Sequence, residues 1–168
     1  MLIKIIGGAL IITGSARWGF SRAEKLSLRV KSLMALKTAF NLLEGEIIFS
    51  SYYLKYTFER VSRLCSCEDL FLTAAELIGE NGAADAWKTA VEKNKYLLAL
   101  KESDAEILQI FASGLGVSDR EQQVKNIRHI SSLLDSAIAD ARSEYDSMAK
   151  IYRSIGVLGG LFIFILLL

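Results

Sequence analysis

The sequence has 168 residues, which is enough for one domain with a sizeable core. Hydrophobic residues make up 52% of it and proline is absent, which argues against a disordered chain or a turn-rich protein and favours long helices. The formal net charge of +1 argues against a broad nucleic-acid-binding surface. One histidine and two cysteines are too few for most metal sites or a disulfide framework.

The two ends of the chain are its most apolar parts. Residues 5–16 and residues 154–168 carry no charged side chain. As a helix the C-terminal run spans about 22 Å, which is shorter than the ~30 Å thickness of the hydrocarbon core. The turn of residues 150–153 lengthens it toward that thickness, because its basic side chains can snorkel. The alternative at the N-terminus is a cleaved signal peptide, but the basic residues that follow this stretch argue against it. The alternative at the C-terminus is a buried core helix, but this run has no polar face. We therefore expect membrane anchors at residues 1–20 and 151–168, on either side of a domain at 21–150.

Charge placement predicts the orientation. Residues 17–37 carry six basic residues and one acid, so the positive-inside rule places the domain in the cytoplasm and both termini across the membrane. In that reducing compartment Cys65 and Cys67 are expected to be free thiols, and their i, i+2 spacing would point them apart on a helix. Residues 1–43 with 147–168 have a net charge of +8, whereas residues 44–146 have −7. The acidic part is either an ordinary solvated surface or a face that docks a basic cytosolic partner.

Apolar residues recur at steps of three and four along the whole domain, which predicts helices and no sheet. The first expected helix carries an apolar stripe from Leu26 to Ile47, and the next three cover residues 54–64, 70–78 and 83–94. The fifth is expected to start at a capping box of Ser103 and Glu106, and the last at a capping box of Ser118 and Glu121. The last helix carries a heptad-like seam and is expected to continue into the second membrane span. Its seam comprises Ile127, Ile130, Leu134, Ile138, Ala141, Tyr145, Met148, Tyr152 and Ile155. The predicted fold is all-α, an antiparallel helical bundle between N- and C-terminal membrane anchors.

The sequence offers no catalytic constellation. Phosphate-loop glycine patterns, a GxSxG elbow and a zinc ligand set are all missing from it. Glu44 and Glu46 flank Gly45 and would point about 200° apart on a helix, away from any shared substrate. We expect neither an enzyme, nor a metal, nor a cofactor, nor a small-molecule substrate. Gly156 and Gly160, four residues apart in the C-terminal span, are expected to pack that helix against the N-terminal anchor or another subunit.

Two motifs carry a resemblance to a known family. The first, LEGEIIFSSYYL, runs from Leu43 to Leu54, and the second, LGVSDREQQVKNI, runs from Leu115 to Ile127. With apolar segments at both ends and this length, the chain resembles the stage III sporulation protein AB family of endospore-forming Firmicutes. That family shows a proline before the leucine that ends the first motif, and here Tyr53 replaces it. The candidate partner-binding residues from these motifs are Glu44, Glu46, Ser118, Asp119 and Gln123.

The resemblance implies a function that composition cannot show. The family belongs to the sporulation channel apparatus between mother cell and forespore, and it resembles a cytoplasmic domain of the type II secretion inner-membrane platform protein. The implied partners are the stage III sporulation ATPase and other membrane components of the channel, with a homo-oligomer also possible. The implied location is the mother-cell membrane around the forespore, with the domain facing the cytoplasm. The alternative is a membrane-anchored helical adaptor or signalling protein unrelated to secretion.

Overall fold

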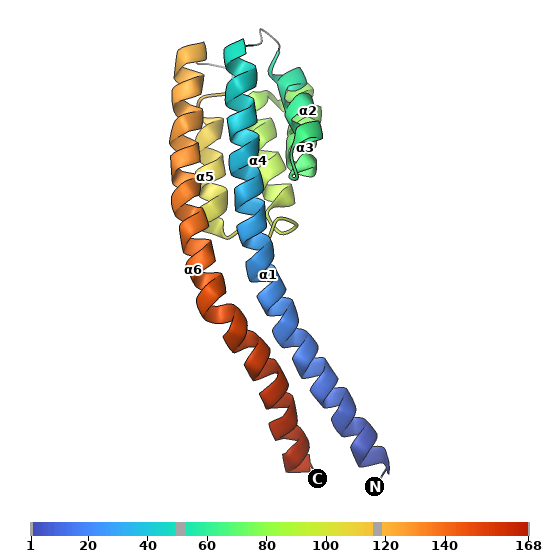
Figure 1. Ribbon diagram of the computed structural model, residues 1–168. Coiled ribbons are helices and arrows are strands. Elements are labelled where there is room, and N and C mark those ends of the chain that lie inside the picture. Colours follow the sequence, from blue (N-terminus) through green and yellow to red (C-terminus); the bar gives the residue numbers. More distant parts are fainter. Residues whose placement is uncertain (1, 50–52, 116–118, 168) are drawn as a thin grey trace. The chain divides into compact units, whose positions relative to one another are not determined.

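The chain folds into helices throughout the part that the structure describes. A computed structural model describes residues 2–49, 53–115 and 119–167, and within these ranges it contains no strand (Figure 1). The helices are α1 (Leu2–Phe49), α2 (Leu54–Leu64), α3 (Glu68–Asn81), α4 (Ala83–Asn94), α5 (Glu102–Ala112) and α6 (Arg120–Leu167). The predicted all-α bundle is confirmed.

Two compact units divide the chain, and α1 and α6 contribute to both. Unit 1 comprises Met1–Val30 with Asp140–Leu168, and unit 2 comprises Lys31–Ala139. Unit 1 therefore contains the start of α1 and the end of α6, whereas unit 2 contains the rest of these two helices and all of α2–α5. The anchor boundaries expected at residues 20 and 151 stay predictions.

Unit 2 is built around an aromatic cluster, which we define as Phe40, Phe58, Phe71, Trp87 and Phe111. One ring comes from each of α1 to α5, and all five side chains are at most 1% exposed. Phe40 makes edge-to-face contacts with the rings of Phe71, Trp87 and Phe111, with centroids 5.0–6.4 Å apart. Such contacts add about 0.5–1.5 kcal/mol per pair to the free energy gained by burying the rings. The short helices are thus held on α1 by this cluster, and α3 also packs along α2 and α4.

Helix ends follow local chemistry, with one correction to the predicted caps. Gly82 separates α3 from α4 with φ of 75°, a conformation that glycine adopts without steric cost. The capping box predicted at Ser103 and Glu106 is wrong, because α5 starts earlier: the Asp104 carboxylate accepts a hydrogen bond of 2.9 Å from the backbone N–H of Lys101. An acidic side chain at the third helical position can reach back to the backbone N–H of the residue before the helix, which has no partner within the helix.

In unit 1 the start of α1 and the end of α6 pack side by side through small residues. Gly8 and Gly19 of α1 and Ala149, Gly156 and Gly160 of α6 are buried. The predicted seam of α6 is wrong at its end, since Met148 and Ile155 are 43% and 56% exposed. A straight helix has 3.6 residues per turn and drifts away from a strict heptad, so the buried stripe moves to a neighbouring row of residues.

One helix is long and apolar enough to cross a membrane in the part of the chain that the structure describes. It is α6, whose most apolar window has a mean hydropathy of 1.6 and is only 17% buried. The large side chains of this segment, such as Leu158, Phe162 and Ile165, are at least 62% exposed. This pattern is typical of a lipid-facing helix rather than of a core helix.

Candidate functional site

Glu44 and Glu46, the acidic residues of the first motif, both form ion pairs within unit 2. Gly45 does not interrupt α1, so the two carboxylates point to different neighbours. Glu44 accepts a hydrogen bond of 2.7 Å from Nε of Arg128 in α6, and Glu46 lies 3.1 Å from Nε of Arg60 in α2. Their side chains are 20% and 16% exposed, whereas both arginines are more than half exposed. These two ion pairs therefore tie α1 to α6 and α2 and leave the guanidinium groups facing solvent.

The second motif marks the start of α6. Ser118 lies outside the described residues. Asp119 caps the helix, because its Oδ1 accepts a hydrogen bond of 2.8 Å from the backbone N–H of Gln122. Gln123 is half-buried and its backbone N–H bonds to the Asp119 carbonyl at 3.0 Å. Asp119 thus fixes where the long helix begins, and a role of Ser118, Asp119 and Gln123 in partner binding stays a prediction.

Gly156 and Gly160 lie against the backbone of α1 inside unit 1. A Cβ on Gly156 would be 2.7 Å from the carbonyl oxygen of Ser15 and 3.0 Å from Cα of Gly19. A Cβ on Gly160 would be 2.9 Å from Cα of Ile12. Distances this short are below ordinary van der Waals contact, so any side chain at either position would force the helices apart.

The exposed side of α3 forms an acidic face, which we define as Glu68, Asp69, Glu76 and Glu80. All four are exposed, α3 contains no basic residue, and none of the four forms an ion pair with another described residue. Leu72, 38% exposed, lies among them at helical spacing. The negative charge of residues 44–146 was predictable from the sequence, and the base-free run from Glu68 to Asn81 is the signal that locates part of it on this helix.

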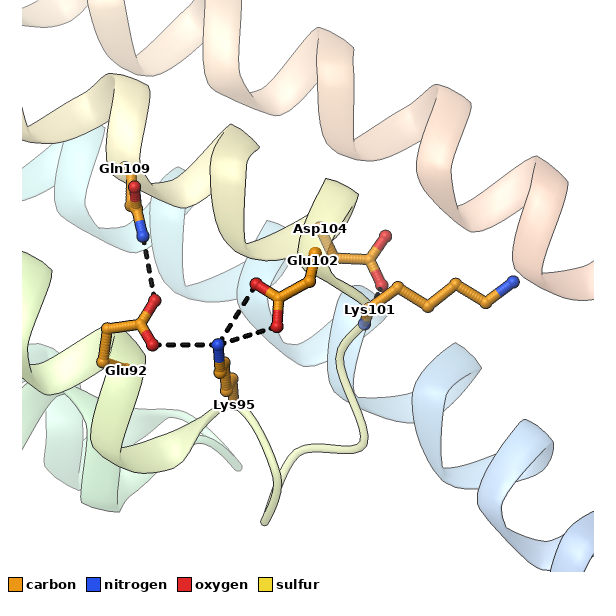
Figure 2. Close-up of polar contacts among 6 residues, drawn as sticks. All are labelled: Glu92, Lys95, Lys101, Glu102, Asp104 and Gln109. Carbon is orange, nitrogen blue, oxygen red and sulfur yellow. Dashed lines mark hydrogen bonds and ion pairs between the residues drawn. The ribbon is translucent and has the colours of Figure 1, made fainter.

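Lys95 joins the end of α4 to the start of α5. Its Nζ lies 2.9 Å from Oε2 of Glu92 and 2.8 Å from Oε1 of Glu102, and Gln109 donates a hydrogen bond to Glu92 (Figure 2). The hydrogen bonds to Glu102 and then Glu92 raise the pKa of Lys95. This ammonium therefore stays charged and holds two helices together, which makes it a structural group rather than a proton donor.

The two cysteines meet between α2 and α3, contrary to the predicted divergence. Cys65 follows the last residue of α2 and Cys67 precedes the first residue of α3, so the segment between them is not helical. The Cys67 thiol donates a hydrogen bond to Sγ of Cys65 at 3.3 Å. That hydrogen bond lowers the pKa of Cys65 to about 7, and together with burial it raises the pKa of Cys67. Both are free thiols, as predicted.

Alkylation should distinguish these two thiols. Because the thiolate is the nucleophile, the reaction of Cys65 with iodoacetamide is expected to be half-maximal near pH 7 and to fall below that pH, while Cys67 stays unmodified up to pH 9. Peptide mass spectrometry across a pH series measures both rates. Cys67→Ala removes the hydrogen-bond donor and should move the midpoint up toward ~8.5, the ordinary value for a thiol. An unmoved midpoint in that variant would contradict the assigned cause.

No group of three or more potential metal ligands occurs among the described residues. What the described geometry does provide is a helical bundle with one unpaired acidic face, and an apolar helix pair in close backbone contact. The model of the stage III sporulation protein AB family matches residues 4–168. The chain belongs to this family.

Similar proteins of the stage III sporulation protein AB family include one from Bacillus subtilis (strain 168). It is 28% identical over 171 residues, which cover 99% of this chain and 100% of that protein. A solved structure of a stage III sporulation protein AB is similar with a TM-score of 0.65 and 27% identity, covering 70% of this chain and 96% of that one. The resemblance inferred from the two motifs is thereby confirmed, and with it a role in sporulation.

Proposed function

We propose that this chain is a non-enzymatic membrane platform component of the channel between mother cell and forespore. In this proposal α6 anchors it, together with α1, in the mother-cell membrane around the forespore, and unit 2 docks the cytosolic stage III sporulation ATPase. Family membership supports the sporulation role, and the exposed apolar end of α6 supports the anchor. Other membrane components of the channel are the further partners that we propose.

The acidic face of α3 is the observation that carries the docking proposal. The carboxylates on the exposed side of this helix form no ion pair with another described residue, so the face carries a negative potential. A basic surface on the ATPase would complement this potential, and exposed Leu72 would supply apolar contact at its centre. Helix α3 is held on the aromatic cluster through Phe71, so it presents the face rigidly.

Charge reversal on α3 tests the docking. In the double variant Glu76→Lys/Glu80→Lys, the affinity for the ATPase from the same organism is expected to fall at least about tenfold, or about 1.4 kcal/mol. Both positions lie in the second half of α3, where lysine is favourable to the helix dipole, so the fold should persist. The full chain in lipid nanodiscs would be titrated with ATPase by biolayer interferometry at low salt and at 0.5 M salt.

A matched control reverses two exposed carboxylates elsewhere, Glu106 in α5 and Asp140 in α6, for the same change in net charge. Equal binding by wild type and both variants would show that the ATPase docks on another surface. If the wild-type chain does not bind the ATPase at any salt concentration, the docking proposal is wrong.

A further inference from the structure

Basic and aromatic side chains of α1 and α6 lie together in unit 1 at the start of the apolar end of α6. We define the collar as the five bases Arg17, Arg22, Lys25, Lys150 and Arg153. All five are exposed, and none of them forms an ion pair with another described residue. The uncharged run of α6 begins at the residue after Arg153. The collar therefore places five positive charges at the point where the chain changes from polar to apolar.

Aromatic rings fix two of these guanidinium groups. Arg22 lies over the ring of Trp18 with Cζ 5.5 Å from the centroid, and Arg153 of α6 lies over Phe20 of α1 at 6.0 Å. Trp18 also contacts Tyr152 edge-to-face at 6.4 Å. Arginine stacked on an aromatic face keeps its N–H groups free to bind oxygen anions. The collar therefore contains oriented hydrogen-bond donors from both α1 and α6.

We propose that the collar binds the phosphate groups of anionic lipids in preference to zwitterionic lipids. Tryptophan and tyrosine favour the depth of lipid headgroups, and Trp18 and Phe20 are 52% and 47% exposed. Basic residues next to a membrane span attract anionic lipids by about 1 kcal/mol each at the surface, and the effect is screened by salt. The acids nearest to the collar along the chain are Glu24 of α1 and Asp146 of α6; neither forms an ion pair with a collar base, and five bases against two acids leave a net positive charge. The proposal rests on the membrane placement proposed above and adds a lipid specificity to it.

Quenching of Trp18 measures which lipid surrounds the collar. The full chain is reconstituted into vesicles of equal parts phosphatidylglycerol and phosphatidylcholine, with acyl-chain bromine on only one of the two lipids at a time. The chain has two tryptophans and Trp87 is fully buried, so subtracting a Trp18→Phe sample isolates Trp18. We expect at least about twofold more quenching when phosphatidylglycerol is brominated, and a smaller difference at 0.5 M salt.

Variants assign the preference to the collar. Changing its five bases to glutamine should bring the two quenching values to equality, whereas Arg→Lys at 17, 22 and 153 should keep most of the difference. The matched control changes five exposed bases of unit 2 to glutamine and should behave as wild type; these are Lys55, Arg63, Lys88, Lys93 and Lys125. Equal quenching in the wild type would overturn the lipid preference and leave the membrane placement intact. No Trp18 quenching by either lipid would overturn both.

Discussion

Replacing Trp87 with alanine is expected to lower the free energy of unfolding by about 3–5 kcal/mol, a large part of the stability of a domain this size. The indole is fully buried and contacts the other four rings of the aromatic cluster at centroid distances of 5.1–5.9 Å. Its Nε1–H also donates a hydrogen bond of 2.7 Å to the carbonyl of Leu108 in α5. The substitution would open a cavity and remove a buried hydrogen bond. Urea unfolding of the full chain in detergent, followed by far-UV circular dichroism, measures the loss.

Two further variants make this result specific. Trp87→Phe keeps a ring in the cluster and loses the hydrogen bond, so a smaller loss of about 1–3 kcal/mol is expected. Trp18→Ala removes the other tryptophan of the chain, which is 52% exposed, and should cost less than about 1 kcal/mol. A Trp87→Ala chain that unfolds within about 0.5 kcal/mol of wild type would show that the aromatic cluster does not hold unit 2 together.

The helices of unit 2 could be predicted because burial imposes a period on the sequence. Helix α4 was predicted at the residues where the structure has it, since Gly82 stops α3 and the apolar side of α4 begins directly afterwards. The stripe on α1 was equally readable, with Leu33, Leu36, Phe40 and Leu43 fully buried. The hydrophobicity of each of these residues indicates that it is buried, so the sequence alone is enough to predict the helix.

The buried row at the end of α6 was not predictable in the same way. Large apolar residues normally mark the packed face of a helix, which is why the predicted seam includes Met148 and Ile155. In unit 1 the buried residues are mostly alanine and glycine, and most of the large apolar residues are exposed, although the ring of Phe164 lies against Gly8. In the proposed membrane placement the surroundings of unit 1 are as apolar as its side chains, so hydrophobicity no longer marks the packed face and close backbone approach decides the packing.

The candidate site shows the same division. The sequence predicted that Glu44 and Glu46 diverge, which the uninterrupted helix through Gly45 confirms, but not that Arg128 and Arg60 would pair with them. Those partners are 84 and 14 positions away along the chain and depend on how the helices associate. The sequence shows that residues 68–81 carry acids and no base, but not that these acids lie together on an exposed face, since that depends on which side of α3 the aromatic cluster buries.

Replacing Gly156 with alanine is expected to destabilise unit 1 by about 1–3 kcal/mol. The added methyl would meet the carbonyl oxygen of Ser15 at 2.7 Å and Cα of Gly19 at 3.0 Å, and both are backbone atoms of a helix that cannot move alone. The helices would have to separate along their whole contact, which would also remove the contact of Trp18 with Tyr152 one turn away. Thermal unfolding of the full chain in detergent should show a midpoint lower by several degrees, together with a change in Trp18 emission.

Gly159 provides the matched control on the same helix. A Cβ there meets nothing within 4 Å, so Gly159→Ala should stabilise the helix by up to about 1 kcal/mol through alanine's higher helix propensity. The same chemical change three residues apart is therefore expected to have opposite signs. Propensity acts equally at both positions, so the difference between the two variants measures the steric contact alone. If both alanine variants raise the midpoint, α1 and α6 do not approach each other closely at Gly156, and the small-residue packing of unit 1 is wrong.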